Sequence, residues 1–167
     1  GEAGHEAVDS ALDIALAQLD ASRAREGEAL RGDLLLRLGR MKALRQEMTF
    51  RAAQIPPALK ERLIDRVTAL ASSLPIDPTR LAQEAALLAI KSDVTEELTR
   101  FGGHLEACAA ALAGGGPAGR QMDFLLQEMH RELNTAAAKA NTGELAQLAI
   151  RGKIELEKVR EQVQNLE

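Results

Sequence analysis

The clearest pattern of apolar and polar positions lies between Arg120 and Lys139. At 100° per residue on a helix, the apolar side chains of this segment fall on one face. They are Met122, Leu125, Leu126, Met129, Leu133, Ala136 and Ala137. The polar side chains divide into two flanks, one with Glu128, Glu132, Thr135 and Lys139, the other with Asp123, Gln127, His130 and Asn134. The pattern predicts an amphipathic helix with one buried face.

The first part of the chain is predicted to form an antiparallel helical hairpin. Its first helix is expected from about Glu6 to Gln54, and the second half has apolar residues at a three- and four-residue spacing typical of a coiled-coil seam. They are Leu30, Leu34, Leu38, Met41, Met48, Ala52 and Ile55, with Arg45 interrupting the seam. Pro56-Pro57 is expected to end this helix and to start a second one that runs to about Ser72. We therefore predict an arm with its tip at Ile55 to Pro57.

The segment from Ser72 to Pro78 is the best candidate for a linker. It separates the predicted hairpin arm, residues 1–76, from a helical C-terminal domain, residues 77–167. Asp77-Pro78 suits the N-cap and the first position of a third helix.

A fourth helix is predicted from the residues that follow Lys91. Asp93 with Glu96 three residues later is a helix-start signature, so the third helix either ends near Lys91 or bends there. One apolar stripe follows, made of Leu98, Phe101, Leu105, Cys108 and Leu112. The glycine-rich segment from Gly114 to Gly119 is expected to be a turn, because it lacks the Lys-Ser/Thr pair of a phosphate-binding loop.

The last helix is expected to start at Thr142-Gly143 and to carry apolar residues at heptad-like intervals. They are Leu145, Leu148, Leu156, Val159, Val163 and Leu166. These residues exceed what one short surface helix needs. We therefore predict a homo-oligomer that forms through this stripe, through the seam of the arm, or through both.

The composition supports an all-α chain. Of its 167 residues, 46% are hydrophobic and 28% are charged, which is ordinary for a globular protein. The chain has no Trp or Tyr and only three Phe, and β-branched residues are scarce, so a sheet has little to build from. The prediction is an all-α fold, with a long antiparallel helical hairpin followed by a helical C-terminal domain.

Charge and cysteine content narrow the possible functions. The formal net charge of −4 argues against general attraction to nucleic acid but leaves room for a local basic patch. Cys108 is the single cysteine, so an intrachain disulfide and a cysteine-based zinc site are excluded. We find no secretory signal and no uncharged run of the ~20 residues that a membrane-spanning helix needs, so we expect a cytoplasmic protein without membrane contact.

Glu128 and Glu132 form the most informative charged pair. Like charges one helical turn apart cost a few tenths of a kcal/mol in an isolated helix, so a nearby cation is expected to offset them. A metal ion or a basic partner would do this, and so would Arg131 and Lys139 within the helix itself. The pair by itself is common on solvated surfaces and leaves both readings open.

Two histidines are candidates for acid–base chemistry. His104 and His130 can each serve as a general acid or base, and each can equally be a partly buried or capping histidine. The chain contains no His-x-x-x-His or His-Glu-x-x-His motif, so zinc hydrolase chemistry has no support.

Three segments form an ordered pattern. They are residues 80–105, which include Lys91-Ser-Asp-Val-Thr-Glu-Glu-Leu98, then Gly119-Arg-Gln-Met-Asp-Phe-Leu-Leu-Gln-Glu-Met-His-Arg-Glu-Leu-Asn-Thr135, and Glu157-Lys-Val-Arg-Glu-Gln-Val-Gln-Asn-Leu-Glu167. Together they resemble the C-terminal domain of the YicC-like family over about residues 77–167. The predicted arm resembles the middle region of that family more loosely.

The resemblance implies a bacterial, metal-dependent endoribonuclease that acts on RNA and assembles as an oligomer. A Mg²⁺ or Mn²⁺ ion would be held by carboxylates, with water and a substrate phosphate completing its shell. It would activate water or stabilise charge on the phosphate. The motif positions imply Glu128, Glu132 and His104 as catalytic residues. The implied metal ligands are Asp93, Glu96, Glu97, Asp123, Glu128 and Glu132.

RNA contact is expected to depend on charge. The basic residues that flank the signature helix suit phosphates, and they are Arg100, Arg120, Arg131 and Lys139. A second basic group is expected mainly as solvated helix surface, and it comprises Arg37, Arg40, Lys42, Arg45 and Arg51. Phe50, Phe101 and Phe124 are all expected in apolar faces, which leaves no stacking platform for bases. No specificity for DNA is expected.

The chain departs from the family pattern in several places. His130 stands where the family has Asn, Ala138 where it has Ser, and Arg151-Gly-Lys153 replaces Glu-Leu-Lys. No segment matches the family's sheet-containing N-terminal domain. We therefore expect a fragment or a diverged member, which would be inactive by itself if the site needs that domain.

Three classes of function stay open at this point. The first is a nuclease subunit or nuclease fragment. The second is a non-catalytic RNA-binding or oligomerisation module, which the missing domain and the scarcity of aromatic residues favour. The third is a purely structural helical scaffold, for which the arm and the terminal heptads suffice.

Overall fold

The chain forms six helices in the part that the structure describes. A computed structural model describes residues 2–70, 77–114, 118–140 and 142–164. The helices are α1 (Glu2–Ala52), α2 (Ile55–Leu70), α3 (Pro78–Lys91), α4 (Thr95–Ala113), α5 (Gly119–Lys139) and α6 (Gly143–Val163). No strand occurs in these ranges, so the predicted all-α class is confirmed.

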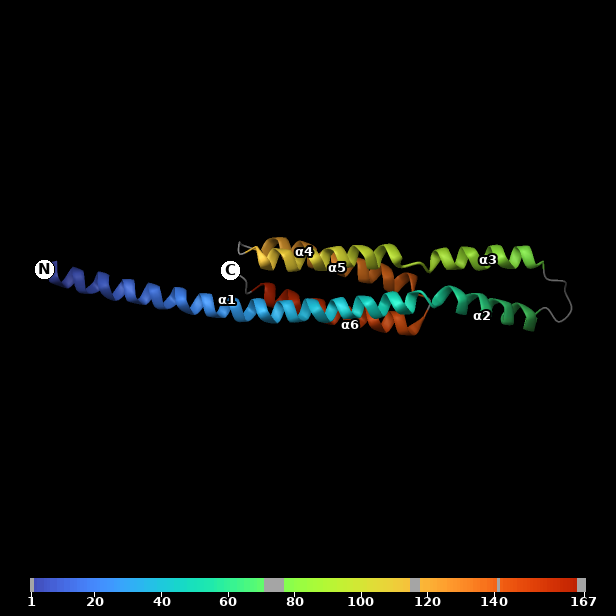
Figure 1. Ribbon diagram of the computed structural model, residues 1–167, viewed down its shortest axis with the longest axis horizontal. Helices are drawn as coiled ribbons and strands as arrows, with labels where there is room; N and C mark the ends of the chain where they lie inside the picture. The colour runs from blue at the N-terminus through green and yellow to red at the C-terminus, as the bar shows by residue number, and fades with distance from the viewer. Residues whose placement is uncertain (1, 71–76, 115–117, 141, 165–167) are drawn as a thin grey trace.

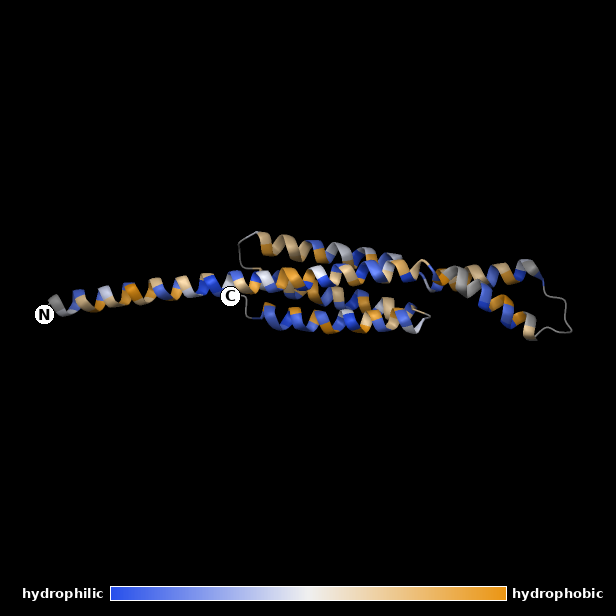
Figure 2. Ribbon diagram, turned by 60° about the horizontal axis from the view of Figure 1, so that its bottom comes forward, coloured by the Kyte–Doolittle hydropathy of each residue, from blue (hydrophilic) through white to orange (hydrophobic). Residues whose placement is uncertain are grey.

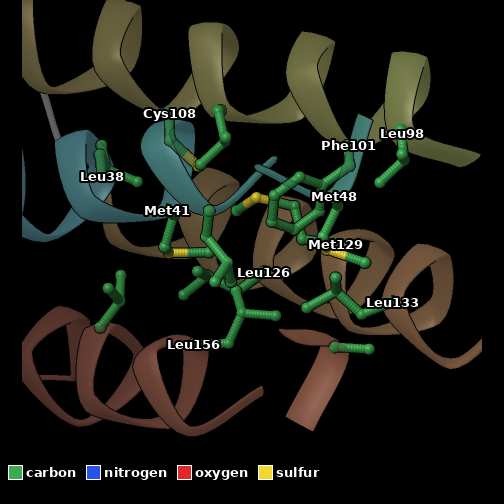
Figure 3. Close-up of a cluster of buried hydrophobic side chains, with 14 of the residues drawn as sticks. Leu38, Met41, Met48, Leu98, Phe101, Cys108, Leu126, Met129, Leu133 and Leu156 are labelled. Atoms are coloured by element: carbon green, nitrogen blue, oxygen red, sulfur yellow. The ribbon is translucent and has the colours of Figure 1, made fainter. Parts of the chain in front are cut away.

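The second half of α1 packs with α4, α5 and α6 in an up-down-up-down four-helix bundle (Figure 1). α4 contacts α1 and α5, and α6 contacts α5 and α1, so each helix has two antiparallel neighbours. The apolar stripes of the four helices meet in a single core (Figure 3). Met41, Phe101, Met129 and Leu133 are fully buried there. The stripes predicted for these four segments are therefore the core.

Two glycines allow the helices to approach closely. A Cβ atom on Gly152 of α6 would lie 2.8 Å from Leu133 Cδ1 and 3.0 Å from Leu44 Cδ2. A Cβ atom on Gly102 of α4 would lie 2.6 Å from Cζ of Arg45. The Nε atom of Arg45 donates a hydrogen bond to the carbonyl oxygen of Leu98 at 2.7 Å. The arginine that interrupts the apolar seam of α1 thus links α1 to α4.

The predicted pairing of the first two helices is wrong. α2 continues in the direction of α1 and pairs with α3, so the chain does not reverse at Ile55 to Pro57 (Figure 1). Pro56 and Pro57 lie in the first turn of α2, where a missing amide hydrogen costs no helical hydrogen bond. The prolines therefore begin a helix without reversing the chain. The reversal falls between α2 and α3, and the linker predicted at residues 72–78 lies mostly outside the described residues.

Two short breaks interrupt the long helical rods, and both lie beside the same open cavity. Ala53 and Gln54 separate α1 from α2, and residues 92–94 separate α3 from α4. The cavity measures about 440 Å³ and has lining residues from both breaks, including Ala53, Ser92 and Val94. Oδ1 of Asp93 accepts a hydrogen bond from the Thr95 amide at 2.9 Å. The third helix therefore ends at Lys91, and a new helix starts after Asp93.

The N-terminal half of α1 projects beyond the bundle (Figure 1). Five large apolar side chains on it are at least half exposed, and four of them lie on one side of the helix: Val8, Leu12, Leu16 and Leu19, with Ile14 on the opposite side. Leu12 precedes Leu30 by 18 residues, and Leu16 precedes Leu34 by the same number, which is about five helical turns. These residues therefore continue the face of α1 that is buried inside the bundle. Figure 2 shows apolar residues along this projecting segment.

The apolar stripe of α6 is used inside the chain. Leu145, Leu148, Leu156, Val159 and Val163 are all buried against the other helices of the bundle. The prediction that this stripe forms an oligomer is therefore wrong for these five residues, because they are already buried within the chain. Leu166, the sixth residue of the predicted stripe, lies outside the described residues. The predicted division at residues 76 and 77 stays a prediction, and α1 shares its core with α4 to α6.

Cys108 is buried, and burial raises the pKa of its thiol to about 11, so it is neutral near pH 7. Among the described helices, none has an apolar stretch long enough to span a lipid bilayer.

Candidate functional site

Most of the predicted site residues lie along the contact between α4 and α5, which we call the α4–α5 seam. Its polar members are Glu96, Glu97, Arg100 and His104 of α4, with Glu128, Glu132 and Lys139 of α5. The helices are antiparallel, because the first turn of α4 faces the last turn of α5. The Nζ atom of Lys139 donates a hydrogen bond to Glu97 Oε1 at 2.7 Å.

A second ion pair crosses the same seam one turn further along. A guanidinium nitrogen of Arg100 lies 3.7 Å from Glu132 Oε1, and the same guanidinium pairs with Glu96. Glu97 and Glu132 are only 7% and 6% exposed. Buried carboxylates need a cation or hydrogen-bond donors, so these two are held by Lys139 and Arg100. For Glu132 the offsetting cation is Arg100 of α4, whereas Lys139 pairs with Glu97. Neither Lys139 nor Arg131 pairs with Glu132 or Glu128 among the described residues.

The charges at this end of the seam influence one another. The hydrogen bond to the Glu97 carboxylate raises the pKa of Lys139 against the opposing effect of desolvation, with further attraction from Glu96 and Asp93. Hydrogen bonds from Thr95 lower the pKa of Asp93, the hydroxyl contributing more than the amide. Both groups are therefore charged near neutral pH. The Oε2 atom of Glu97 is buried without a hydrogen bond from any described residue, so Lys139 is its main stabilising partner.

His104 and Glu128 lie one turn beyond the Arg100–Glu132 pair. Because the helices are antiparallel, four residues forward from Arg100 and four back from Glu132 lead to neighbouring positions. Both side chains are partly exposed. Neither has a hydrogen bond or ion pair to another described residue. They are the titratable pair of the seam that stays available to a ligand.

The solvent-facing side of α5 carries a second group, which we call the outer stripe. Its members follow one another at four- and three-residue steps and are all exposed: Arg120, Phe124, Gln127, Arg131, Asn134 and Ala138. The stripe contains no acidic residue. Among the described residues, neither guanidinium has an acidic partner within salt-bridge distance. Arg120 and Arg131 are therefore available for an anion.

Asp123 does not join the other predicted metal ligands. It faces α6, where its Oδ1 atom lies 3.5 Å from Nε of Arg160, and it accepts a hydrogen bond from Gln127. No three His, Cys, Asp or Glu residues in the described ranges come together as a possible metal site. Glu97 and Glu132 already neutralise cations of the protein. A resident divalent ion held by three ligands therefore does not fit this arrangement, and metal dependence stays a prediction.

Two of the three phenylalanines are not in apolar faces. Phe101 is fully buried, but Phe50 and Phe124 are 64% and 61% exposed, so that expectation is wrong for both. The signal was present in the sequence, because Phe124 lies about 140° around the helix from Met129, the centre of the buried stripe. Position 124 therefore belongs to the solvent-facing side of the helix, whatever the hydrophobicity of its side chain.

The basic group on α1 is mostly occupied by contacts within the chain. Arg37 lies 2.7 Å from Asp33 and 3.6 Å from Glu155, and Arg51 lies 3.2 Å from Glu144. The Asp33 carboxylate raises the pKa of Arg37 through a hydrogen bond. These arginines therefore link α1 to α6 and are less suited to RNA than those of the outer stripe.

The protein is an all-helical bundle, and the face formed by α4 and α5 carries Arg120 and Arg131 together with His104 and Glu128. A family model described as the C-terminal region of YicC-like endoribonucleases matches residues 48–167. The chain belongs to the YicC-like endoribonuclease family.

Two similar proteins carry the name "Probable endoribonuclease YicC". The protein from Clostridioides difficile (strain 630) is 36% identical over 161 residues, which cover 96% of this chain and 55% of the relative. The protein from Haemophilus influenzae (strain ATCC 51907 / DSM 11121 / KW20 / Rd) is 38% identical over 161 residues, which cover 95% of this chain and 54% of the relative. The chain thus spans about half the length of these relatives.

The pairing of Glu97 with Lys139 generates a test of the seam. Lys139→Met should lower the free energy of unfolding by about 1–3 kcal/mol, because it leaves a buried carboxylate without its cation. Adding Glu97→Gln should recover part of the loss. Lys158→Met is the control, since Lys158 is exposed and its half-buried partner Glu155 keeps Arg37 as a second cation, so the loss should be at most about 1 kcal/mol. Urea denaturation at pH 7 measures all four proteins, and equal losses for both lysines would contradict a structural role for this pair.

Proposed function

We propose that the α4–α5 seam and the outer stripe of α5 form the RNA-contacting face of an endoribonuclease. The observation that carries this proposal is the outer stripe itself, with two arginines that lack acidic partners among the described residues and no acid in line with them. RNA presents regularly spaced phosphates, and arginine binds phosphate through charge and paired hydrogen bonds. The names of the similar proteins support RNA as the substrate.

Cleavage within this proposal depends on His104 and Glu128. One group would accept the proton of the attacking hydroxyl, and the other would donate a proton to the leaving oxygen. Glu132, also predicted as catalytic, is buried beside Arg100 and would position that guanidinium. Lys139 is held by Glu97, so its contribution to RNA binding would be smaller than that of Arg120 or Arg131.

Substitution of the two free arginines tests RNA binding. Arg120→Gln with Arg131→Gln should weaken binding of a fluorescent single-stranded RNA about tenfold, because two phosphate contacts are lost. The slope of log K against log salt should become shallower by about 1.4, or 0.7 for each contact. Arg23→Gln with Arg25→Gln, on the exposed part of α1, is the matched control and should leave both quantities unchanged. Equal effects of the two double variants would contradict a localised binding face.

Cleavage by the same face has a separate test. Glu128→Gln and His104→Gln should each reduce the cleavage rate of a labelled single-stranded RNA by a factor of about 10²–10⁴, without changing thermal stability. Glu106→Gln is the control, since this exposed carboxylate of α4 lies on the side that faces α1. Assays with Mg²⁺, with Mn²⁺ and with EDTA test the predicted metal dependence.

The outcome also decides between the two functional classes. Full activity of Glu128→Gln would contradict its catalytic role. A wild-type chain that binds RNA without cleaving it would favour the alternative, a non-catalytic RNA-binding module.

A homo-oligomer is part of the proposal, and the projecting half of α1 is the surface that would form it. Replacing Leu12 and Leu19 together by Gln should shift light scattering toward monomer, since burial of each leucine is worth about 1.5–3 kcal/mol. Ile14→Gln is the control, because Ile14 is 57% exposed but lies on the opposite side of the helix. A wild-type chain that stays monomeric at every concentration would contradict the oligomer. The cytoplasmic location stays a prediction.

A further inference from the structure

Phe124 occupies an unusual place among the exposed residues of α5. It is 61% exposed, while its neighbours Met122, Leu125 and Leu126 are buried in the core. Isolated exposed apolar residues are normal on protein surfaces, so exposure by itself indicates little. The surroundings of Phe124 are what distinguish it. Arg120 precedes it by one turn and Arg131 follows it by two, on the same exposed stripe.

The spacing of these three residues suits a nucleotide strand. With a rise of 1.5 Å per residue, Arg120 lies about 6 Å before Phe124 along the helix axis, and Arg131 about 10 Å after it. Successive phosphates of a strand lie closer together than Arg120 and Arg131, which are about 16 Å apart along the helix axis, so the two arginines would contact phosphates separated by more than one nucleotide, on either side of a base at Phe124. Proteins that bind single strands combine cationic tracks with aromatic side chains on which bases stack. The outer stripe provides both elements on one helix.

The acidic residues near Phe124 do not neutralise the positive charge of Arg120 and Arg131. Asp123 is directed toward α6, where Arg160 lies 3.5 Å away. Glu128 lies on the seam side of α5 and is partly buried. The line from Arg120 to Arg131 therefore keeps a positive character on the solvent side.

We propose that Phe124 stacks on an unpaired base of single-stranded RNA while Arg120 and Arg131 hold phosphates on either side of it. This inference rests on the proposed function and adds a preference for single strands. A base within a duplex is already stacked and paired, so its face is closed to Phe124. The RNA-contacting face would therefore select unpaired segments through one aromatic side chain.

Phe50 provides a matched control within the same chain. It is 64% exposed and also lies on a long helix of the bundle, α1. Its nearest arginine, Arg51, pairs with Glu144 at 3.2 Å, and Glu47 lies one turn before it. Phe50 is thus as exposed as Phe124, but it does not lie between two arginines that lack acidic partners.

The absence of tryptophan and tyrosine from the sequence makes a direct optical test possible. Phe124→Trp and Phe50→Trp each introduce a single indole into the full chain. The probe is an oligoadenylate of about 12 nucleotides, used as a single strand and also annealed to oligouridylate. Stacking should quench the fluorescence of the Phe124→Trp variant with the single strand and not with the duplex. The Phe50→Trp variant should show little change with either.

Affinity gives the second measurement. Phe124→Ala should weaken binding of the single-stranded oligoadenylate roughly five- to a hundredfold, the range expected for loss of one base–aromatic stack. The salt slope should stay as in the wild-type chain, because no phosphate contact is removed. Phe50→Ala should change the affinity less than about twofold, and circular dichroism melting should show both variants folded.

The possible results separate this inference from the proposed function. If the wild-type chain fails to bind the oligoadenylate, the RNA-contacting face is wrong and the stacking role falls with it. If the wild-type chain binds and the Arg120→Gln, Arg131→Gln variant binds weakly, while Phe124→Ala binds as wild type, only the stacking role is wrong. Equal losses for Phe124→Ala and Phe50→Ala would also overturn it.

Discussion

Burial of the apolar face of α5 between α4 and α6 is the constraint on which the candidate site depends. Met122, Met129 and Leu133 are fully buried, so the rotation of α5 about its own axis is fixed. Once that rotation is fixed, every other side chain of the helix has a set direction. Glu132 and Lys139 meet α4, Asp123 and His130 lie beside α6, and the outer stripe faces solvent. A helix that was free to rotate by a quarter turn would exchange these environments.

Two of the carboxylates in the α4–α5 seam form ion pairs that join the helices. Glu97 and Glu132 resemble metal ligands when read along the sequence, but their cations are Lys139 and Arg100. Buried pairs of this kind give little net stability compared with apolar packing, yet breaking one is costly, so they fix the register between two helices. Their ion pairs join α4 to α5, and His104 and Glu128 lie one turn beyond the Arg100–Glu132 pair on the same seam.

The sequence predicted the four core stripes because helical periodicity is a local property that each segment carries in full. It did not predict how the helices pair, since Pro56-Pro57 is equally compatible with a reversal and with a new helix in the same direction. Of the two glutamates on one flank, Glu132 is buried and Glu128 is partly exposed, and only the neighbouring helix α4 decides this. The partners of Asp123, Arg100 and Lys139 likewise depend on contacts between distant segments. The exposed position of Phe124 was readable from its angle on the helix.

The two breaks beside the cavity are the points at which the α2–α3 pair joins the bundle. The i→i−4 hydrogen bonds of the two helices end at the Ala53 and Ser92 amides, and the cavity lies beside both breaks. Rotation of a few backbone dihedrals at these points would tilt the pair and would also move Ile55 and Val94, which are buried in the core. The break at residues 92–94 directly precedes the first turn of α4, where Glu97 pairs with Lys139 of α5. A tilt of α2 and α3 would therefore move the part of α4 that carries this ion pair.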